Sequence, residues 1–104
     1  MNQFDVYTII LDSAKSSEIK NTRPGVIISP TVMNKHLKTV IIAPLTHTIK
    51  NYPSRVSSSF AGQTGQIALD HIRSVDKSRL KKKIGSLDAT TANNIKLVLA
   101  TMFS

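Results

Sequence analysis

The pattern of apolar and polar positions predicts a chain built largely from short β-strands. Several short runs alternate β-branched or aromatic side chains with other residues, and turn-forming residues separate these runs. The expected strands are residues 4–11, 26–29, 39–44, 55–59, 66–69 and 72–75. Residues 12–18 are typical of a polar loop, residues 31–38 leave room for one helical turn, and residues 62–65 are typical of a turn.

The spacing of the apolar positions changes at the C-terminal end. From residue 91 to residue 102 they recur at helical spacing, and Asp88 is placed to cap the first helical turn. No repeat, low-complexity tract or shift of composition divides the 104 residues, and a chain of this length buries one core. We therefore expect a single domain over residues 1–104, mainly β within the α+β class, forming a small barrel with a C-terminal helix.

The composition favours an anionic partner. Fourteen Lys and Arg residues stand against six Asp and Glu residues, which gives a formal net charge of +8. Long-range attraction then favours nucleic acid or an acidic protein. Five basic residues form a local cluster, namely Lys77, Arg79, Lys81, Lys82 and Lys83. Such a cluster suits a phosphate-contacting edge or the charged rim of a strand, and a merely solvated basic surface is the alternative.

The residues present also argue against several classes of site. The chain contains no cysteine, which excludes disulfides, thiolate metal sites and cysteine nucleophiles. The histidines lack close-spaced partners and the acids are scattered, so we expect neither a metal nor a cofactor. No apolar run approaches the ~20 residues of a membrane span, and the first residues lack the pattern of a signal peptide. We therefore expect a soluble cytoplasmic protein with no membrane partner.

Three segments, in this order, resemble the MazF/PemK (Kid) family of toxin endoribonucleases from type II toxin–antitoxin systems. The first is residues 17–29, with an acidic loop residue, an Arg-Pro step and a short strand. The second is the Pro-x-Thr step in residues 44–48, with Lys-Asn-Tyr-Pro just downstream at 50–53. The third is residues 65–79, in which the run Asp-His-Ile-Arg-Ser-Val-Asp at residues 70–76 resembles a family motif. Together they cover nearly the whole chain.

The chain departs from the family pattern at three positions. Ser17 stands where the family often has glycine or histidine, and His71 stands where glutamine usually follows the aspartate. Ala68 occupies a position that is arginine in Kid-like members. The acid–base set of that branch is therefore only partly present.

The resemblance implies a fold, an activity and a set of partners. The fold is an SH3-like barrel shared with the gyrase poison CcdB. The activity is metal-independent, sequence-selective cleavage of single-stranded mRNA through attack by the ribose 2′-OH, in the bacterial cytoplasm. The partners are a cognate acidic antitoxin, a second copy of the chain in a homodimer, and operator DNA reached through the antitoxin complex. The RNA sequence that is cut stays open.

Cleavage without a metal needs positive charge or hydrogen-bond donors on the phosphorane, and groups that move protons. Together with the resemblance, this requirement assigns Arg23 to hold the phosphate, Thr46 to donate from its hydroxyl, and Asp70 to act as base or as an orienting acceptor. The expected RNA-binding residues are Glu18, Lys20, His47, Thr48, Lys50, Tyr52, His71 and Arg73. For proton transfer we rank Asp70 ahead of the two histidines in this set.

Each assignment has a simpler alternative. Arg23 can pair with Glu18 to close the loop, Thr46 can satisfy its own backbone in a turn, and the histidines can belong to a polar rim or a dimer interface. For the whole protein, a CcdB-like gyrase poison and a non-catalytic binding module are the alternatives. The gyrase-binding tip of CcdB uses a Trp, and this chain has none.

Overall fold

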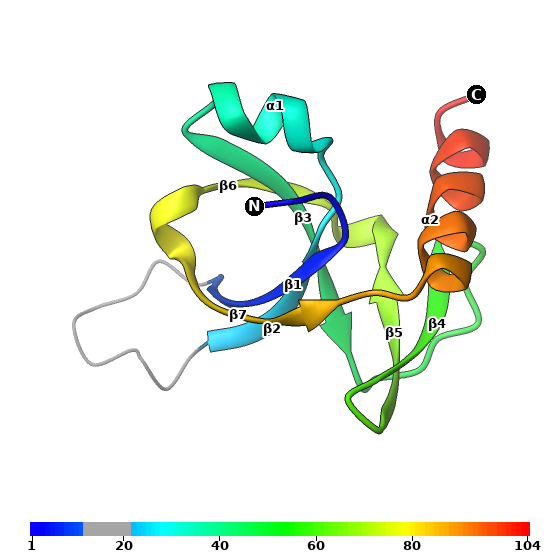
Figure 1. Ribbon diagram of the computed structural model, residues 1–104. Helices are drawn as coiled ribbons and strands as arrows, with labels where there is room; N and C mark the ends of the chain where they lie inside the picture. Colours follow the sequence, from blue (N-terminus) through cyan, green and yellow to red (C-terminus); the bar gives the residue numbers. More distant parts are fainter. Residues whose placement is uncertain (12–21) are drawn as a thin grey trace.

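The computed structural model describes residues 1–11 and 22–104, and its elements are mainly β-strands. Figure 1 shows a curled sheet with a short helix near the N-terminus and a longer helix at the C-terminus. In chain order the elements are β1 (Asp5–Ile10), β2 (Thr22–Ile27), α1 (Thr31–His36), β3 (Thr39–Thr46), β4 (Arg55–Phe60), β5 (Gln63–Ala68), the 3-10 turn η2 (Leu69–His71), β6 (Arg73–Asp76), the 3-10 turn η3 (Lys77–Arg79), β7 (Leu80–Ser86) and α2 (Ala89–Met102). The expected fold class, mainly β with a small barrel and a C-terminal helix, is confirmed, and the sheet curls into a half-barrel.

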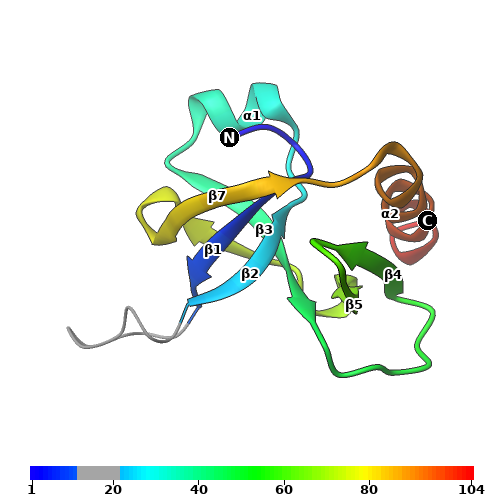
Figure 2. The ribbon, with the colours of Figure 1, turned by 60° about the horizontal axis from the view of Figure 1, so that its bottom comes forward.

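Strand β3 lies at the centre of the sheet, whose order is β4-β5-β3-β2-β1-β7. All the strand pairs are antiparallel. The first half of β3 pairs with β6, its last two residues pair with β5, and residues 42–44 pair with β2. The two views in Figures 1 and 2 show β4, β5 and α2 together on one side of the molecule.

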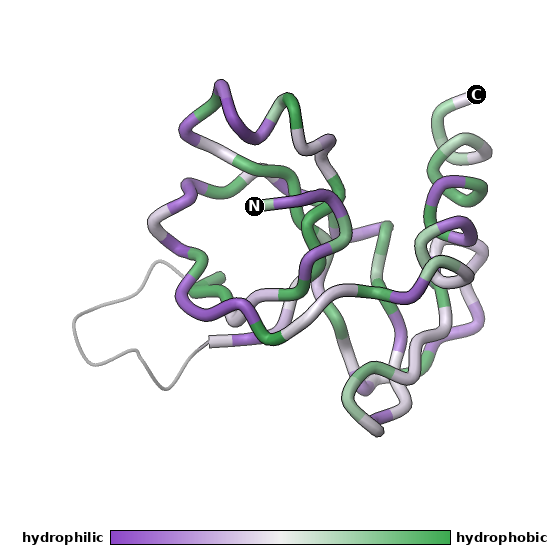
Figure 3. The backbone as a smooth tube through the Cα atoms, viewed as in Figure 1, coloured by the Kyte–Doolittle hydropathy of each residue, from purple (hydrophilic) through white to green (hydrophobic). Residues whose placement is uncertain are grey.

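Two apolar clusters form the core because neighbouring residues of a strand point to opposite faces. Val26 packs into a cluster with Ile67 and Ile95, whereas the next residue, Ile27, packs into another with Ile9. Ile95 is the α2 residue that is fully buried, so α2 covers the first cluster. Figure 3 shows hydrophobic positions along the central strands and a hydrophilic stretch in β7. Burial of these side chains therefore holds the helix on the sheet.

Helix α2 begins as its sequence predicts. The carboxylate of Asp88 accepts hydrogen bonds from the backbone N–H of Thr91 at 3.2 Å and from its hydroxyl at 2.6 Å. This cap satisfies one of the N–H groups that the first helical turn leaves without an internal partner.

Within the described residues, no helix is long and apolar enough to cross a membrane.

The largest differences from the expected strand boundaries are at the starts of β2 and β5. Strand β2 starts at Thr22, not at residue 26, because Thr22, Arg23 and Pro24 pair with β1. Strand β5 starts at Gln63, so the expected turn at 62–65 is wrong. The actual turn is Ala61–Gly62, where both residues have positive φ (53° and 76°), the geometry that two-residue hairpins favour.

Strand β7 was not among the expected strands. The three lysines at 81–83 that we treated as a charged cluster lie in β7, which pairs with β1. Three consecutive lysines break the alternation of apolar and polar residues, which is why the pattern of the sequence missed the strand. Lysines at the edge of a sheet also discourage pairing with further strands.

Candidate active site

A groove between β2 and the end of β3 brings two of the expected catalytic residues together. A pocket of about 510 Å³ is lined by Leu11, Thr22, Arg23, Pro24, Pro44, Leu45, Thr46, His47 and Thr48. Strands β2 and β3 are antiparallel with Gly25 opposite Pro44, so the residues before Gly25 lie toward the residues after Pro44. Arg23 is exposed on this face. Its guanidinium can therefore meet a ligand in the groove.

A second pocket, of about 220 Å³, adjoins the first. It is lined by Pro44, Thr46, Arg55, Ala68 and His71. The two pockets share Pro44 and Thr46. Thr46 therefore lies between the Arg23 end and the His71 end of one continuous surface, which we call the site groove.

The hydroxyl of Thr46 is held in place by its own turn. Its oxygen accepts a hydrogen bond from the backbone N–H of Thr48 at 3.1 Å. This contact is the turn interaction that a threonine makes with its own backbone. A hydroxyl also carries one hydrogen, which that contact does not use. The turn thus fixes the oxygen and leaves the hydrogen able to donate to a bound anion.

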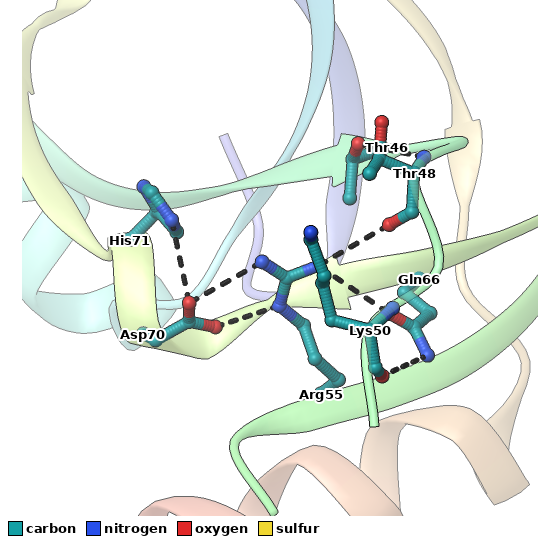
Figure 4. A network of polar contacts seen from close by, with 7 residues as sticks. All are labelled: Thr46, Thr48, Lys50, Arg55, Gln66, Asp70 and His71. Atoms are coloured by element: carbon teal, nitrogen blue, oxygen red, sulfur yellow. Dashed lines mark hydrogen bonds and ion pairs between the residues drawn. The ribbon is translucent and has the colours of Figure 1, made fainter. Parts of the chain in front are cut away.

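Arg55, the first residue of β4, anchors the other end of the groove (Figure 4). Its side chain is only 7% exposed, and Nε and Nη2 donate to the two carboxylate oxygens of Asp70 at 2.8 and 3.3 Å. Nη1 donates to the carbonyl of Thr48 and to the side-chain oxygen of Gln66, both at 3.3 Å. The two-pronged contact with Asp70 fixes the guanidinium plane.

Gln66 and Tyr52 complete this network. The Gln66 side chain accepts from the backbone N–H of Lys50 and donates to its carbonyl, each at 3.0 Å. The Tyr52 ring lies 5.3 Å from the Arg55 guanidinium, within the range of a cation–π contact. Together these contacts tie the 47–54 segment to β4, β5 and η2.

Sequence reasoning missed both Arg55 and Gln66. Each begins an expected strand; Arg55 lies outside the segments that resemble the family, and Gln66 precedes the run at 70–76 that carries the third resemblance. Their role arises from the antiparallel pairing of β4 with β5, which brings Arg55 opposite Ala68 and so next to η2. No periodicity or motif in the chain signals that juxtaposition.

The contact with Arg55 sets the charge of Asp70. The Arg55 hydrogen bond, more than any other group, lowers the pKa of Asp70 from 3.8 to about 2. The Nε2 atom of His71 lies 3.3 Å from the Asp70 Oδ2 atom, and the His71 side chain is 63% exposed. Asp70 is thus a stable carboxylate, and a carboxylate with so low a pKa is a poor proton acceptor near neutral pH.

The other expected residues are distributed around the groove. His47 lines the larger pocket, and its Nδ1 lies 3.4 Å from the carbonyl of Thr64. Arg73 lines neither pocket, but its Nη1 donates at 3.2 Å to the carbonyl of Leu11, which lines the larger one. Glu18 and Lys20 lie outside the described residues. The alternative pairing of Arg23 with Glu18 therefore lies outside them too. Among the described residues, no group of three acidic or histidine side chains is arranged to hold a metal ion.

The Arg55 contact predicts how stability depends on pH. Because the pKa of Asp70 is lower in the folded state, its contribution is complete above pH 3.8 and is lost as the pH falls through about 2. Asp70→Asn should therefore lower the melting temperature at pH 6, and the gap to the wild type should close between pH 3.8 and about 2. Thermal unfolding followed by circular dichroism measures this gap. A gap that stays constant down to pH 2 would contradict the assignment.

Comparison with known proteins agrees with this architecture. Residues 2–103 match the sequence profile described as PemK-like, MazF-like toxin of type II toxin-antitoxin system. The chain is 37% identical over 90 residues to Endoribonuclease MazF of Staphylococcus saprophyticus subsp. saprophyticus, covering 81% of this chain and 75% of that protein. It is also similar to a mycobacterial endoribonuclease solved in complex with its cognate antitoxin (TM-score 0.83, 26% identity, 99% of this chain and 94% of the other). For MazE-MazF from Deinococcus radiodurans, the TM-score is 0.81 at 21% identity, over 100% and 95% of the two chains, which supports the fold alone. The chain belongs to the family of PemK-like, MazF-like toxins of type II toxin–antitoxin systems.

Proposed function

We propose that this chain is an endoribonuclease toxin that cleaves single-stranded RNA without a metal ion. The observation that supports this proposal is the site groove, in which Arg23 and Thr46 line one pocket. A cation and a hydroxyl donor on one surface are what a phosphorane requires. The 37% identical relative is named an endoribonuclease, which favours cleavage over gyrase poisoning or binding without catalysis.

In the proposed reaction, the ribose 2′-oxygen attacks the adjacent phosphorus while the bond from phosphorus to the 5′-oxygen breaks. Arg23 donates two hydrogen bonds to the non-bridging oxygens, where negative charge builds up. Thr46 donates a further hydrogen bond from a hydroxyl whose oxygen is already fixed by Thr48. The products are a 2′,3′-cyclic phosphate and a 5′-hydroxyl end.

RNA on either side of the cleaved bond is expected to follow the rim of the groove. His47 and Thr48 line the larger pocket, and Lys50 lies in the segment that Gln66 holds. Tyr52 is half exposed, with Arg55 against its ring, so a base can stack on the outer surface. We assign the same supporting role to Arg73, Glu18 and Lys20, and we place the activity in the bacterial cytoplasm.

The proposed chemistry predicts which substrates and conditions allow cleavage. A long single-stranded RNA incubated with the protein in EDTA should give discrete fragments whose 5′ pieces end in a cyclic phosphate. Replacing the 2′-OH at the cleaved nucleotide with hydrogen should abolish the cut, because no nucleophile remains. Arg23→Ala should lower the rate at least ~100-fold, the effect of removing one preorganised donor.

Two variants of Thr46 provide a matched comparison for this test. Thr46→Ser keeps the hydroxyl and should stay active, whereas Thr46→Val removes the donor at nearly constant volume. The loss in Thr46→Val should be smaller than in Arg23→Ala, because a hydroxyl is a neutral donor. A strict need for Mg²⁺, or a product with a 3′-hydroxyl, would refute the mechanism. Full activity of Arg23→Ala would refute the site.

We also propose that the toxin is a homodimer that buries the outer face of α2. Leu97 is 68% exposed, and with Pro53, Val98, Thr101 and Met102 it lines an apolar pocket. An isolated small domain with such a face gains stability by pairing. Sedimentation at micromolar concentration should give the mass of a dimer, and Leu97→Glu should give a monomer. Val32→Glu on α1, at 69% exposure, is the matched control and should stay dimeric.

The antitoxin partner is expected to be acidic and to cover Arg23 in the site groove. The net charge of +8 favours such a partner, and operator DNA would be reached through the toxin–antitoxin complex. Toxin–antitoxin affinity, measured by calorimetry, should fall steeply between 50 mM and 500 mM salt, since salt screens exposed charges. Affinity that does not change with salt would contradict the electrostatic part of this proposal.

A further inference from the structure

His71 lies where the Arg55–Asp70 ion pair meets the site groove. It lines the smaller pocket with Thr46 and Arg55, and it is the one imidazole among the residues that line that pocket. Its Nε2 lies 3.3 Å from Asp70, and the side chain is 63% exposed to a ligand in the groove. Figure 4 shows Asp70 between the His71 ring and the Arg55 guanidinium. The three side chains thus form a chain of contacts that runs from the protein interior to the groove.

Asp70 is fully occupied within this chain of contacts. Both of its oxygens accept hydrogen bonds from Arg55, and the second also faces the imidazole. A carboxylate that is held in this way orients a histidine ring and stabilises the positive charge that the ring acquires when it takes a proton. The acid in a serine-protease triad has the same role. Asp70 is therefore better suited to orient His71 than to take the proton itself.

We propose that His71 is the general base of the cleavage reaction, and that Asp70 and Arg55 are positioning residues that fix its ring. This inference rests on the proposed ribonuclease function and differs from our sequence-based ranking, which put Asp70 first. With the Nε2 hydrogen directed at Asp70, the Nδ1 lone pair is left to accept a proton. The ring geometry thereby selects the tautomer that the reaction needs.

The proposed proton transfer is balanced as follows. The 2′-hydroxyl gives its proton to Nδ1 of His71 as the bond from the 2′-oxygen to phosphorus forms. The bond from phosphorus to the 5′-oxygen breaks, and that oxygen takes a proton from water. His71 then releases its proton to solvent. Arg23 and Thr46 stabilise the charged oxygens throughout and gain or lose no proton.

Few other charges face His71 from the elements packed around η2. Asp70 lies on η2 itself, and Arg55 on β4 is neutralised by it. Arg73, at the start of β6, is directed to the Leu11 carbonyl. Strand β3 carries no charged residue, and the charged residue of α2, Lys96, lies over the Phe4 ring. Asp70 is therefore the charged side chain that contacts the His71 ring.

The test measures single-turnover RNA cleavage in EDTA from pH 5 to pH 9. The wild-type rate should rise with pH over the range in which histidines lose their charge, because the neutral ring is the base. His71→Ala should lower the rate about 100-fold and flatten that rise, and added imidazole should restore part of the rate. His36→Ala is the matched control: His36 is exposed on α1 and lines neither pocket of the groove, so the rate of this variant should equal that of the wild type.

The Asp70→Asn variant distinguishes the role of Asp70 in orienting the His71 ring from the role of His71 in taking the proton. Removing the negative charge makes the protonated ring less stable, so the rise in rate should move to lower pH, with a rate loss of about tenfold. If Asp70→Asn unfolds because Arg55 loses its partner, His71→Ala with imidazole rescue still decides the question. A full-rate His71→Ala enzyme with an unchanged pH profile would overturn the inference and leave the proposed ribonuclease intact. A wild-type protein that cuts no RNA would overturn both.

Discussion

The site depends on strand β3, which is paired along both edges. Its residues 39–42 pair with β6 and its last two residues with β5, while β2 occupies the opposite edge. Both faces of β3 are buried, since Val40 and Ile42 enter one apolar cluster and Ala43 enters the other. A shift of one residue would turn each side chain to the wrong face. The position of Thr46 relative to Arg23 and η2 is therefore set by the core.

Two arginines near the groove are in opposite physical situations. Arg55 is almost fully removed from water, so its charge needs the Asp70 carboxylate and two further oxygens to offset the lost hydration. Arg23 is exposed and keeps its positive charge for a ligand. The buried cation holds the architecture of the site, and the exposed one is the group that we propose to attract phosphate. Because one arginine is held by the ion pair and the other is exposed, the site is rigid and its surface is still basic.

The sequence by itself determined the fold class, the C-terminal helix and the family. β-Branched runs, turn residues and the Asp88 cap act over a few residues, so they are visible without a structure. The segments around Arg23, Thr46 and Asp70 carried the family resemblance, and the matched profile bears out the family. The sequence pattern did not predict strand β7, because its lysines interrupt the alternation of apolar and polar residues. It also misplaced the hairpin turn, which lies at Ala61–Gly62, because glycine at 65 suggested a longer loop.

Only the tertiary structure decided which polar groups act together. Arg55 and Asp70 are 15 residues apart, and Gln66 reaches Lys50 across 16 residues. Their contacts exist because β4 pairs with β5 and because η2 follows directly. Local sequence patterns do not predict such pairings, because their geometry comes from the closure of the sheet. For the same reason the low pKa of Asp70 followed from the hydrogen bond that Arg55 donates to it, and the case for His71 followed from the contact of its ring with Asp70 at the groove.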